Sequence, residues 1–502
     1  MPQTSAQVLE ALRDLRHAIA AEAETRIGGW RDDIEGPAFG PSAANLAHYL
    51  AFRHHDLRGL QRDLMRHGLS SLGRLESRVL VTLDAVTGML EASLRGGPEA
   101  GKPGAAKPGT SKPGAGWPPT DDSFFHGEAL LRANTERLLG TTTRHRGRIL
   151  VTLSGEAAED PGYVLGLAQR GADLVRINCA HDSAAEWGAM ITHTRQAAVA
   201  VGRRIPVLMD IAGPKFRIGE VRRESGQRLA TGDRFRLVRD AGCFGTDAMI
   251  EAVCHPAAAL DSLVPGGEVA LDDGKLHGTV EQVAPGRVLV RVDRAAPKGF
   301  KMKPERGLVF PHADLRLDPL TADDLADLDF VARHADMVGF SFVQSADDIT
   351  RLQQELAKRR PDWQRLGIVA KIETEQAVTN LPDIVVRAAG RQPFGVMIAR
   401  GDLAVAIGFE RLAEMQEEML WLCEAAHVPV IWATQVLEEL VKSGLPTRGE
   451  MTDAAMAARA ECVMLNKGPN VAEAITALDG LLQRMTGHQS KKTARLRALH
   501  AW

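Results

Sequence analysis

After residue 147 of this 502-residue chain, short apolar runs repeatedly end in polar or charged side chains. In chain order these residues are Arg176 and Asn178, Asp210, Ser341, Lys371 with Glu373, Asp402, and Thr434. A single polar residue at the end of a run means little, because a chain must turn polar where it leaves a core. Cations, carboxylates and hydroxyls that converge from several strands instead indicate a catalytic or binding site.

Residues 369–373, Val-Ala-Lys-Ile-Glu, alternate so that Lys371 and Glu373 point to the same side of a strand. Glu373 and Asp402 follow neighbouring strands. Two carboxylates in that arrangement suit a Mg²⁺ that keeps waters and binds substrate oxygens. The structural alternatives are a Lys371 whose stem snorkels to a surface ion pair, and carboxylates that cap helix N-termini, Asp402 in particular.

The composition limits the classes of function. With 61 Lys and Arg against 64 Asp and Glu, the net charge is −3, which excludes electrostatic capture of bulk nucleic acid. No P-loop, HExxH or GxSxG motif occurs, and the five cysteines lie far apart without zinc spacing. Neither a signal peptide nor a long apolar run is found. We therefore expect a cytoplasmic protein without a membrane or nucleic-acid partner.

Eight runs rich in Val, Ile and Leu alternate with helical stretches, which favours βαβ units and a parallel sheet. The runs cover residues 148–153, 173–178, 206–211, 336–343, 367–372, 394–399, 429–434 and 462–467. Eight strand and helix units in series predict the α/β class and a (β/α)₈ TIM barrel, with an open doubly wound sheet as the alternative.

The other segments differ in texture. Residues 1–97 have helical periodicity and predict an N-terminal helical domain, whereas residues 98–120, with KPG three times, predict a disordered linker. Alternating runs between turn residues predict an inserted β lid domain, a small β-barrel, over 218–306. The TIM barrel would then comprise 121–217 and 307–486, with 487–502 as a C-terminal tail. An insertion after a barrel strand emerges at the face where barrel active sites lie.

Several motifs occur in a fixed order along the barrel. They are VRINCAH (175–181), MDIAGPKFR (209–217), Lys371 with Glu373, ARGDL (399–403), ATQ (433–435), and PTRGE (446–450) with Asp453. Together they make residues 147–484 resemble the catalytic core of pyruvate kinase, in which a β lid also follows the third strand. A series of matches over this length is much more specific than any one motif.

The resemblance implies phosphoryl transfer from phosphoenolpyruvate to ADP, giving pyruvate and ATP, with Mg²⁺ or Mn²⁺. It implies that Glu373 and Asp402 hold the metal, and that Lys371 neutralises charge on the phosphoryl and enolate oxygens. Such a reaction needs clustered positive charge and in-line positioning rather than a protein nucleophile. The other implied roles are phosphoryl contact for Arg176, a second cation at Arg217, proton delivery through water near Thr434, and substrate or nucleotide binding by Asn178, His181, Ser341 and Gly401.

The monovalent-cation site departs from the family pattern. Potassium-dependent members hold K⁺ with Asn, Ser, Asp and Thr, and here those positions read Asn178, Ala180, Asp210 and Ile211, so two oxygen ligands are missing. Lys215 occupies a position that is Glu in potassium-dependent members and Lys in potassium-independent ones. Its ammonium can supply the missing charge as a tethered cation. We therefore predict activity without K⁺; the alternative is a surface lysine beside a decayed site.

Two departures lie near the end of the chain. Residues 466–470, NKGPN, stand where the family usually has SGET. We also expect the family's additional C-terminal α/β domain to be missing. Many members bind sugar-phosphate effectors and form a subunit interface in that domain. The sequence alone leaves open whether this chain forms a homo-oligomer. The alternatives to a kinase are a related barrel aldolase or lyase acting on pyruvate or phosphoenolpyruvate, and a degenerate paralogue that binds a metabolite without turnover.

Overall fold

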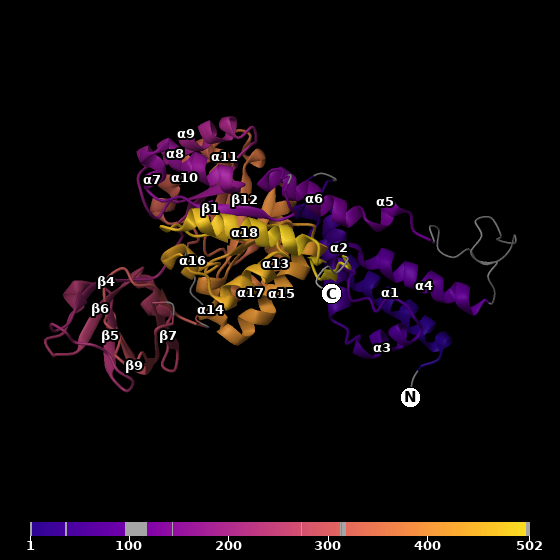
Figure 1. Cartoon of the computed structure of the whole chain (residues 1–502). Helices are drawn as coiled ribbons and strands as arrows, with labels where there is room; N and C mark the ends of the chain where they lie inside the picture. The colour runs from indigo at the N-terminus through magenta and orange to yellow at the C-terminus, as the bar shows by residue number, and fades with distance from the viewer. Residues whose placement is uncertain are drawn as a thin grey trace.

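A computed structural model describes residues 3–35, 38–95, 118–142, 144–272, 274–311, 313 and 318–497. Its centre is a closed barrel of eight parallel strands (Figure 1). These are β1 (Arg148–Thr152), β2 (Leu174–Asn178), β3 (Val207–Ile211), β11 (Met337–Phe340), β12 (Gly367–Ile372), β13 (Phe394–Ala399), β14 (Val430–Ala433) and β15 (Cys462–Leu465). The pairing of β1 with β15 closes the ring. The predicted (β/α)₈ barrel is therefore confirmed, and the open sheet is excluded.

Helices follow each strand except β3 and cover the outside of the barrel. Four of the longer ones, α9, α10, α11 and α17, start with a capping box, in which a Ser or Thr and an acidic residue three positions later satisfy free backbone N–H groups. The helices are α7 (Glu156–Glu159), α8 (Pro161–Arg170), α9 (Ala184–Ala200), α10 (Ala322–His334), α11 (Ala346–Arg359), α12 (Glu375–Thr379), α13 (Leu381–Ala389), α14 (Arg400–Ile407), α15 (Phe409–Ala425), α16 (Glu438–Ser443), α17 (Arg448–Ala457) and α18 (Val471–Thr486).

A helix closes the barrel at the amino-terminal ends of its strands. Helix α6 (His126–Leu139), which follows the short α5 (Asp121–Phe124), places Leu138 and Leu139 in one apolar cluster with interior strand residues such as Leu150 and Met337. A β-carbon on Gly367 would lie 2.5 Å from the side chain of Leu138, so that glycine permits the close approach of the helix. The interior is thus filled, and an open site remains at the carboxyl ends of the strands.

The segment after β3 forms a separate sheet with its own apolar core. Its strands are β4 (Arg217–Arg222), β5 (Arg234–Val238), β6 (Ile250–His255), β7 (Glu268–Leu271), β8 (Leu276–Ala284), β9 (Arg287–Ala295) and β10 (Leu308–Val309), in the order β10-β7-β8-β9-β5-β6-β4. The alternating runs predicted β5, β7, β8 and β9. Strand β6 is buried along most of its length rather than alternating, and β10 has two residues, so neither gave a period-2 signal.

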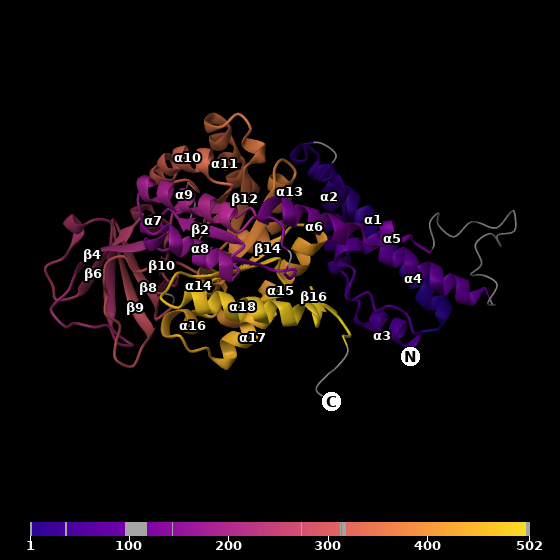
Figure 2. The same cartoon turned by 45° about the horizontal axis from the view of Figure 1, so that its top comes forward.

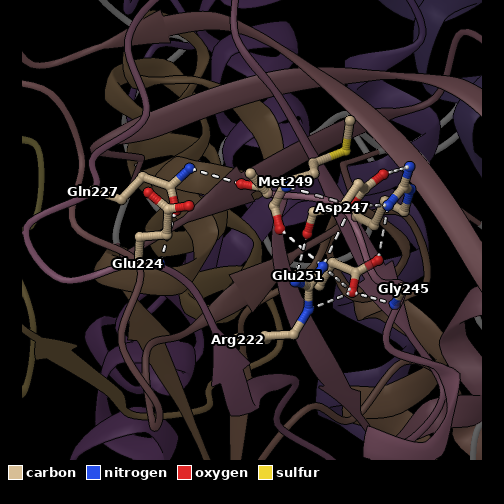
Figure 3. A network of polar contacts seen from close by, with 9 residues as sticks. Arg222, Glu224, Gln227, Gly245, Asp247, Met249 and Glu251 are labelled. Atoms are coloured by element: carbon tan, nitrogen blue, oxygen red, sulfur yellow. Dashed lines mark hydrogen bonds and ion pairs between the residues drawn. The ribbon is translucent and has the colours of Figure 1, made fainter.

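A buried carboxylate holds one end of this sheet together. Glu251 on β6 is fully buried and accepts hydrogen bonds from Arg222, Arg236 and the backbone N–H of Gly245 (Figure 3). Burial alone would raise the pKa of Glu251, but the two guanidinium groups outweigh it and hold the pKa below its ordinary value. The loop that contains Gly245 is thereby tied to β4 and β5.

The N-terminal helices dock on the barrel at the end of the molecule away from the β insertion (Figure 1, Figure 2). They are α1 (Ser5–Gly29), α2 (Gly40–Arg53), α3 (Arg58–Arg66) and α4 (Val79–Leu94). The buried ring of His427, after α15, contacts Ser42 Oγ at 2.8 Å and the carbonyl of Ser77 at 3.0 Å. Trp30 Nε1 donates to Asp383 Oδ1 on α13 at 2.7 Å. The linker predicted over 98–120 lies almost wholly outside the described residues.

The C-terminal segment forms a small hairpin of β16 (Gln489–Ser490) and β17 (Thr493–Ala494) after α18. In the described part of the chain, no helix is both long enough and apolar enough to span a membrane.

Candidate active site

A cavity of about 170 Å³ opens at the carboxyl ends of the barrel strands, beside the base of the β insertion. Most of the residues singled out in the sequence line it. They are Arg176 and Asn178 after β2, Lys215 and Arg217 at the base of the insertion, Ser341 after β11, Lys371 and Glu373 at β12, Asp402 in α14, and Thr434 after β14. Asp210 lies beneath the cavity, and Gly401 contacts Thr434.

Asp210 at the end of β3 joins the two central cations. Its Oδ2 accepts from Arg176 Nε at 2.8 Å and lies 3.3 Å from Lys371 Nζ, while the side chain is 1% exposed. Gly339 on the neighbouring strand leaves room for this carboxylate, since a β-carbon there would lie 2.6 Å from Asp210 Oδ1. Burial alone would raise the pKa of Asp210, but Lys371 and Arg176 hold it below its ordinary value. Asp210 is therefore ionised at neutral pH.

Lys371 is held on three sides. Its Nζ donates to Ser341 Oγ at 2.8 Å and lies 3.1 Å from Glu373 Oε1, in addition to its contact with Asp210. Burial alone would lower the pKa of Lys371, but the two carboxylates raise it above its ordinary value. The side chain is 12% exposed, so the surface ion pair considered from the sequence is wrong. The ammonium is a fixed positive charge at the floor of the cavity.

Glu373 and Asp402 face the same cavity without capping a helix. Thr374 caps α12, and α14 begins after Ala399, with Asp402 in its first turn. Glu373 Oε2 instead accepts from the backbone N–H of Phe342 at 2.7 Å. Burial and the charge of Asp402 raise the pKa of Glu373, despite the opposing effect of Lys371. The helix-cap alternative is therefore wrong for both carboxylates.

These two carboxylates fit a divalent metal that takes only part of its ligands from the protein. Each side chain has an ammonium neighbour, Lys371 for Glu373 and Lys215 for Asp402, so both lie where the site already holds positive charge. Among the described residues, no group of three or more His, Cys, Asp or Glu could hold a metal. A Mg²⁺ here would take its remaining ligands from substrate and water, which is the usual arrangement for this ion.

Thr434 sits on a strained turn after β14. Its φ of 64° lies in the left-handed region, as does that of Gln435 at 55°. Thr434 Oγ1 accepts from the backbone N–H of Gly401 at 2.8 Å, and its carbonyl accepts from Arg400 Nη2 at 2.7 Å. Arg400 also pairs with Asp453. The sequence analysis did not single it out as a candidate site residue. Its position in the motif beside Asp402 was the available signal.

The remaining predicted residues lie nearer the rim or away from the cavity. Arg217 lines the cavity and donates to the carbonyl of Glu305 at 3.3 Å. Asn178 lines it as well and accepts from the backbone N–H of Ala180 at 3.3 Å. The side chain of His181 is exposed and is not part of the cavity wall.

The monovalent-cation positions are rearranged around Lys215. Ala180 and Ile211 line the cavity without a side-chain oxygen, and the carboxylate of Asp210 is paired with Arg176 and Lys371. Lys215 Nζ lies 2.9 and 3.0 Å from the two Asp402 carboxylate oxygens, and its side chain is 30% exposed. Lys215 is therefore part of the site rather than a surface lysine.

Fold and site together define a class: a (β/α)₈ barrel with a β domain after its third strand, and with cations and carboxylates gathered at the carboxyl ends of the strands. The family described as pyruvate kinase, barrel domain, matches residues 144–472. Three curated relatives are each named pyruvate kinase. That of Methylorubrum extorquens is 33% identical over 324 residues, which span 64% of each chain.

The relative from Agrobacterium vitis is 32% identical over 351 residues, 68% of this chain and 69% of its own. That of Dictyostelium discoideum is 30% identical over 332 residues, 65% of this chain and 62% of its own. The matches thus span 62–69% of the length of these relatives. The chain belongs to the pyruvate kinase family.

Proposed function

We propose that the protein is a Mg²⁺-dependent pyruvate kinase that transfers the phosphoryl group of phosphoenolpyruvate to ADP. The observation that carries this proposal is the position of Lys371. Its ammonium is held by Asp210, Ser341 and Glu373 at the floor of a cavity that also contains Arg176. A reaction that moves a phosphoryl group and releases an enolate needs fixed positive charge at that place.

Each residue has a defined task in this proposal. Lys371 and Arg176 stabilise charge on the phosphoryl and enolate oxygens, and Asp210 keeps both cations in place. Glu373 and Asp402 would hold the divalent metal, which when bound neutralises charge on substrate oxygens. Thr434, fixed by its hydrogen bond from Gly401, would position the water that protonates the enolate carbon.

The rim residues complete the binding site. Arg217 at the base of the β insertion would approach the substrate when the insertion moves as a lid. Asn178 and Ser341 supply polar groups at the wall. His181 lies outside the cavity wall, so its role in nucleotide binding would require a nucleotide that extends beyond the cavity. The homo-oligomer and the cytoplasmic location stay predictions.

We further propose that turnover does not require K⁺. Lys215 places an ammonium within the site, on Asp402, while Ala180 and Ile211 offer no side-chain oxygen to a monovalent cation. A lysine ammonium is a compact point charge and can act where a bound K⁺ would otherwise do so.

A coupled assay of pyruvate formation from phosphoenolpyruvate and ADP tests both parts. The assay contains Mg²⁺ and a KCl series at constant ionic strength. We expect turnover at every KCl concentration, with less than about twofold change. Strong activation of turnover by KCl, from near zero, would contradict only the proposal that K⁺ is not required. No pyruvate under any condition would contradict the kinase proposal.

A further inference from the structure

A second cavity, of about 320 Å³, lies at the amino-terminal ends of β1 and β15, away from the candidate active site. Its walls are α6, the segments that lead into β1 and β15, the end of α18 and the β16–β17 hairpin. The acids that line it are Glu136 and Glu461, but the cations are Arg132, Arg144, Arg146, Arg148, Arg459 and Lys491. In a chain whose net charge is −3, this is a local excess of positive charge.

Arg148 is the most buried of these guanidinium groups, at 6% exposed. It donates to the carbonyl of Gly140 from Nε at 3.1 Å and from Nη2 at 3.0 Å, and to that of Arg146 at 2.7 Å. Within the described residues it forms no ion pair. Burial lowers its pKa below the ordinary value, despite more distant carboxylates. A buried cation that contacts only neutral carbonyls retains its charge toward a ligand.

The other cations fall into two groups. Three are already neutralised, because Arg144 pairs with Asp479, Arg459 with Glu417, and Lys491 with Glu461. Two more, Arg132 and Arg146, are exposed at the cavity mouth and form no ion pair in the part of the chain that the structure describes. Arg146 contacts the neutral hydroxyl of Ser490. Arg132, Arg146 and Arg148 therefore face one space without an ion pair among the described residues, and Glu136 is a carboxylate of the same lining.

We infer that this cavity binds a small phosphorylated anion through Arg132, Arg146 and Arg148. Guanidinium groups present paired N–H donors that match the oxygens of a phosphate, and three of them around one cavity suit a dianion or a more highly charged group. The volume lies at the lower end of the about 300–1,000 Å³ that is typical of small-molecule sites. Inorganic phosphate, pyrophosphate and phosphate monoesters share this chemistry.

An anion bound in this cavity would also affect the packing of the N-terminal helices. Ser490 and Lys491 of the hairpin line the cavity, and the adjacent Lys492 pairs with Glu76 and lies over the ring of Trp421, 4.4 Å from its centroid. An anion that fixes the hairpin would therefore also strengthen its contact with the segment before α4.

Calorimetric titration of the full chain with pyrophosphate, at constant ionic strength and without Mg²⁺, tests the site. The variant is the double substitution Arg132→Gln with Arg146→Gln, since both side chains are exposed and their loss leaves the barrel core intact. The matched control is Arg137→Gln, an exposed arginine on the same helix that does not line the cavity. Inorganic phosphate and glycerol 3-phosphate are titrated in parallel to separate the free ion from a monoester.

We expect one binding event of the wild type to weaken at least tenfold in the double variant and to persist in Arg137→Gln. The same event should remain in Lys371→Met, because the active-site cations lie at the other end of the barrel. Equal affinity and stoichiometry for wild type and double variant would overturn the inference, as would loss of the event in Lys371→Met alone. Since no turnover is measured, the result does not depend on the proposed kinase activity.

Discussion

Two buried cations at opposite ends of the barrel are satisfied in different ways. Burial alone would lower the pKa of Lys371, but Asp210 and Glu373, at 3.3 and 3.1 Å, raise it. At the amino-terminal end, Arg148 contacts the carbonyls of Gly140 and Arg146, and burial lowers its pKa. One cation is neutralised by its own chain, whereas the other is hydrogen-bonded but not neutralised.

The difference indicates what each end can do. At the carboxyl end, fixed carboxylates hold the cations in place before any ligand arrives, which is the preorganisation that phosphoryl transfer requires. At the amino-terminal end, carbonyl dipoles orient Arg148 but leave its charge for an external anion. In our two proposals the same residue chemistry, positive charge for phosphate oxygens, would serve catalysis at one end and binding at the other.

The largest effect on stability is expected at the carboxyl end. Asp210→Asn removes the carboxylate shared by Arg176 and Lys371 and leaves two buried cations with less compensation. We expect the free energy of unfolding to fall by about 3–5 kcal/mol, measured by chemical denaturation. Asp240→Asn, at an exposed position of the β insertion, is the control and should change it by less than about 0.5 kcal/mol. Equal effects of the two variants would refute the role of Asp210 as the carboxylate that neutralises both buried cations.

A smaller, pH-dependent effect is expected near the second cavity. Burial raises the pKa of Glu424 on α15 to about 8, and its Oε2 is buried without a hydrogen-bond partner in the described residues. In the unfolded chain the carboxyl group of Glu424 ionises near pH 4.5. The free energy of unfolding therefore falls as the pH rises from there through about 8. Glu424→Gln should therefore raise the free energy of unfolding by about 1–3 kcal/mol at pH 8, and by much less at pH 5.

The control for that variant is Glu414→Gln, an exposed position on the same helix. Its difference from the wild type should be small at both pH values. A Glu424→Gln difference that does not grow with pH would show that the carboxyl group is already ionised in the folded protein.

The sequence predicted the barrel because its strands are continuous apolar runs, and the order of those runs dictates which residues share the carboxyl edge. That rule also brought Lys371, Glu373 and Asp402 together, although no residue pattern showed that Asp210 would be the shared partner of Lys371 and Arg176. His181 belongs to a matching motif, yet it lies outside the cavity wall. Motif membership alone does not place a side chain.

The second cavity could not be predicted in the same way. Arg148 begins β1, where a charged residue before a buried run is ordinary. Its unusual state arises from the carbonyl of Gly140 after α6 and from the C-terminal hairpin that closes the cavity beside it. The hairpin and the segment that leads into β1 lie more than 300 residues apart in the sequence, so no local pattern encodes their contact.

The most direct test of the account is the turnover of Lys371→Met in the coupled pyruvate assay. Lys442→Met, an exposed lysine on α16 at 64% exposure, is the control, and circular dichroism checks that both variants fold. We predict that kcat falls by on the order of 10²–10³-fold in Lys371→Met, with KM for phosphoenolpyruvate changed far less, while Lys442→Met matches the wild type. A folded Lys371→Met enzyme with kcat within about twofold of the wild type would contradict the account.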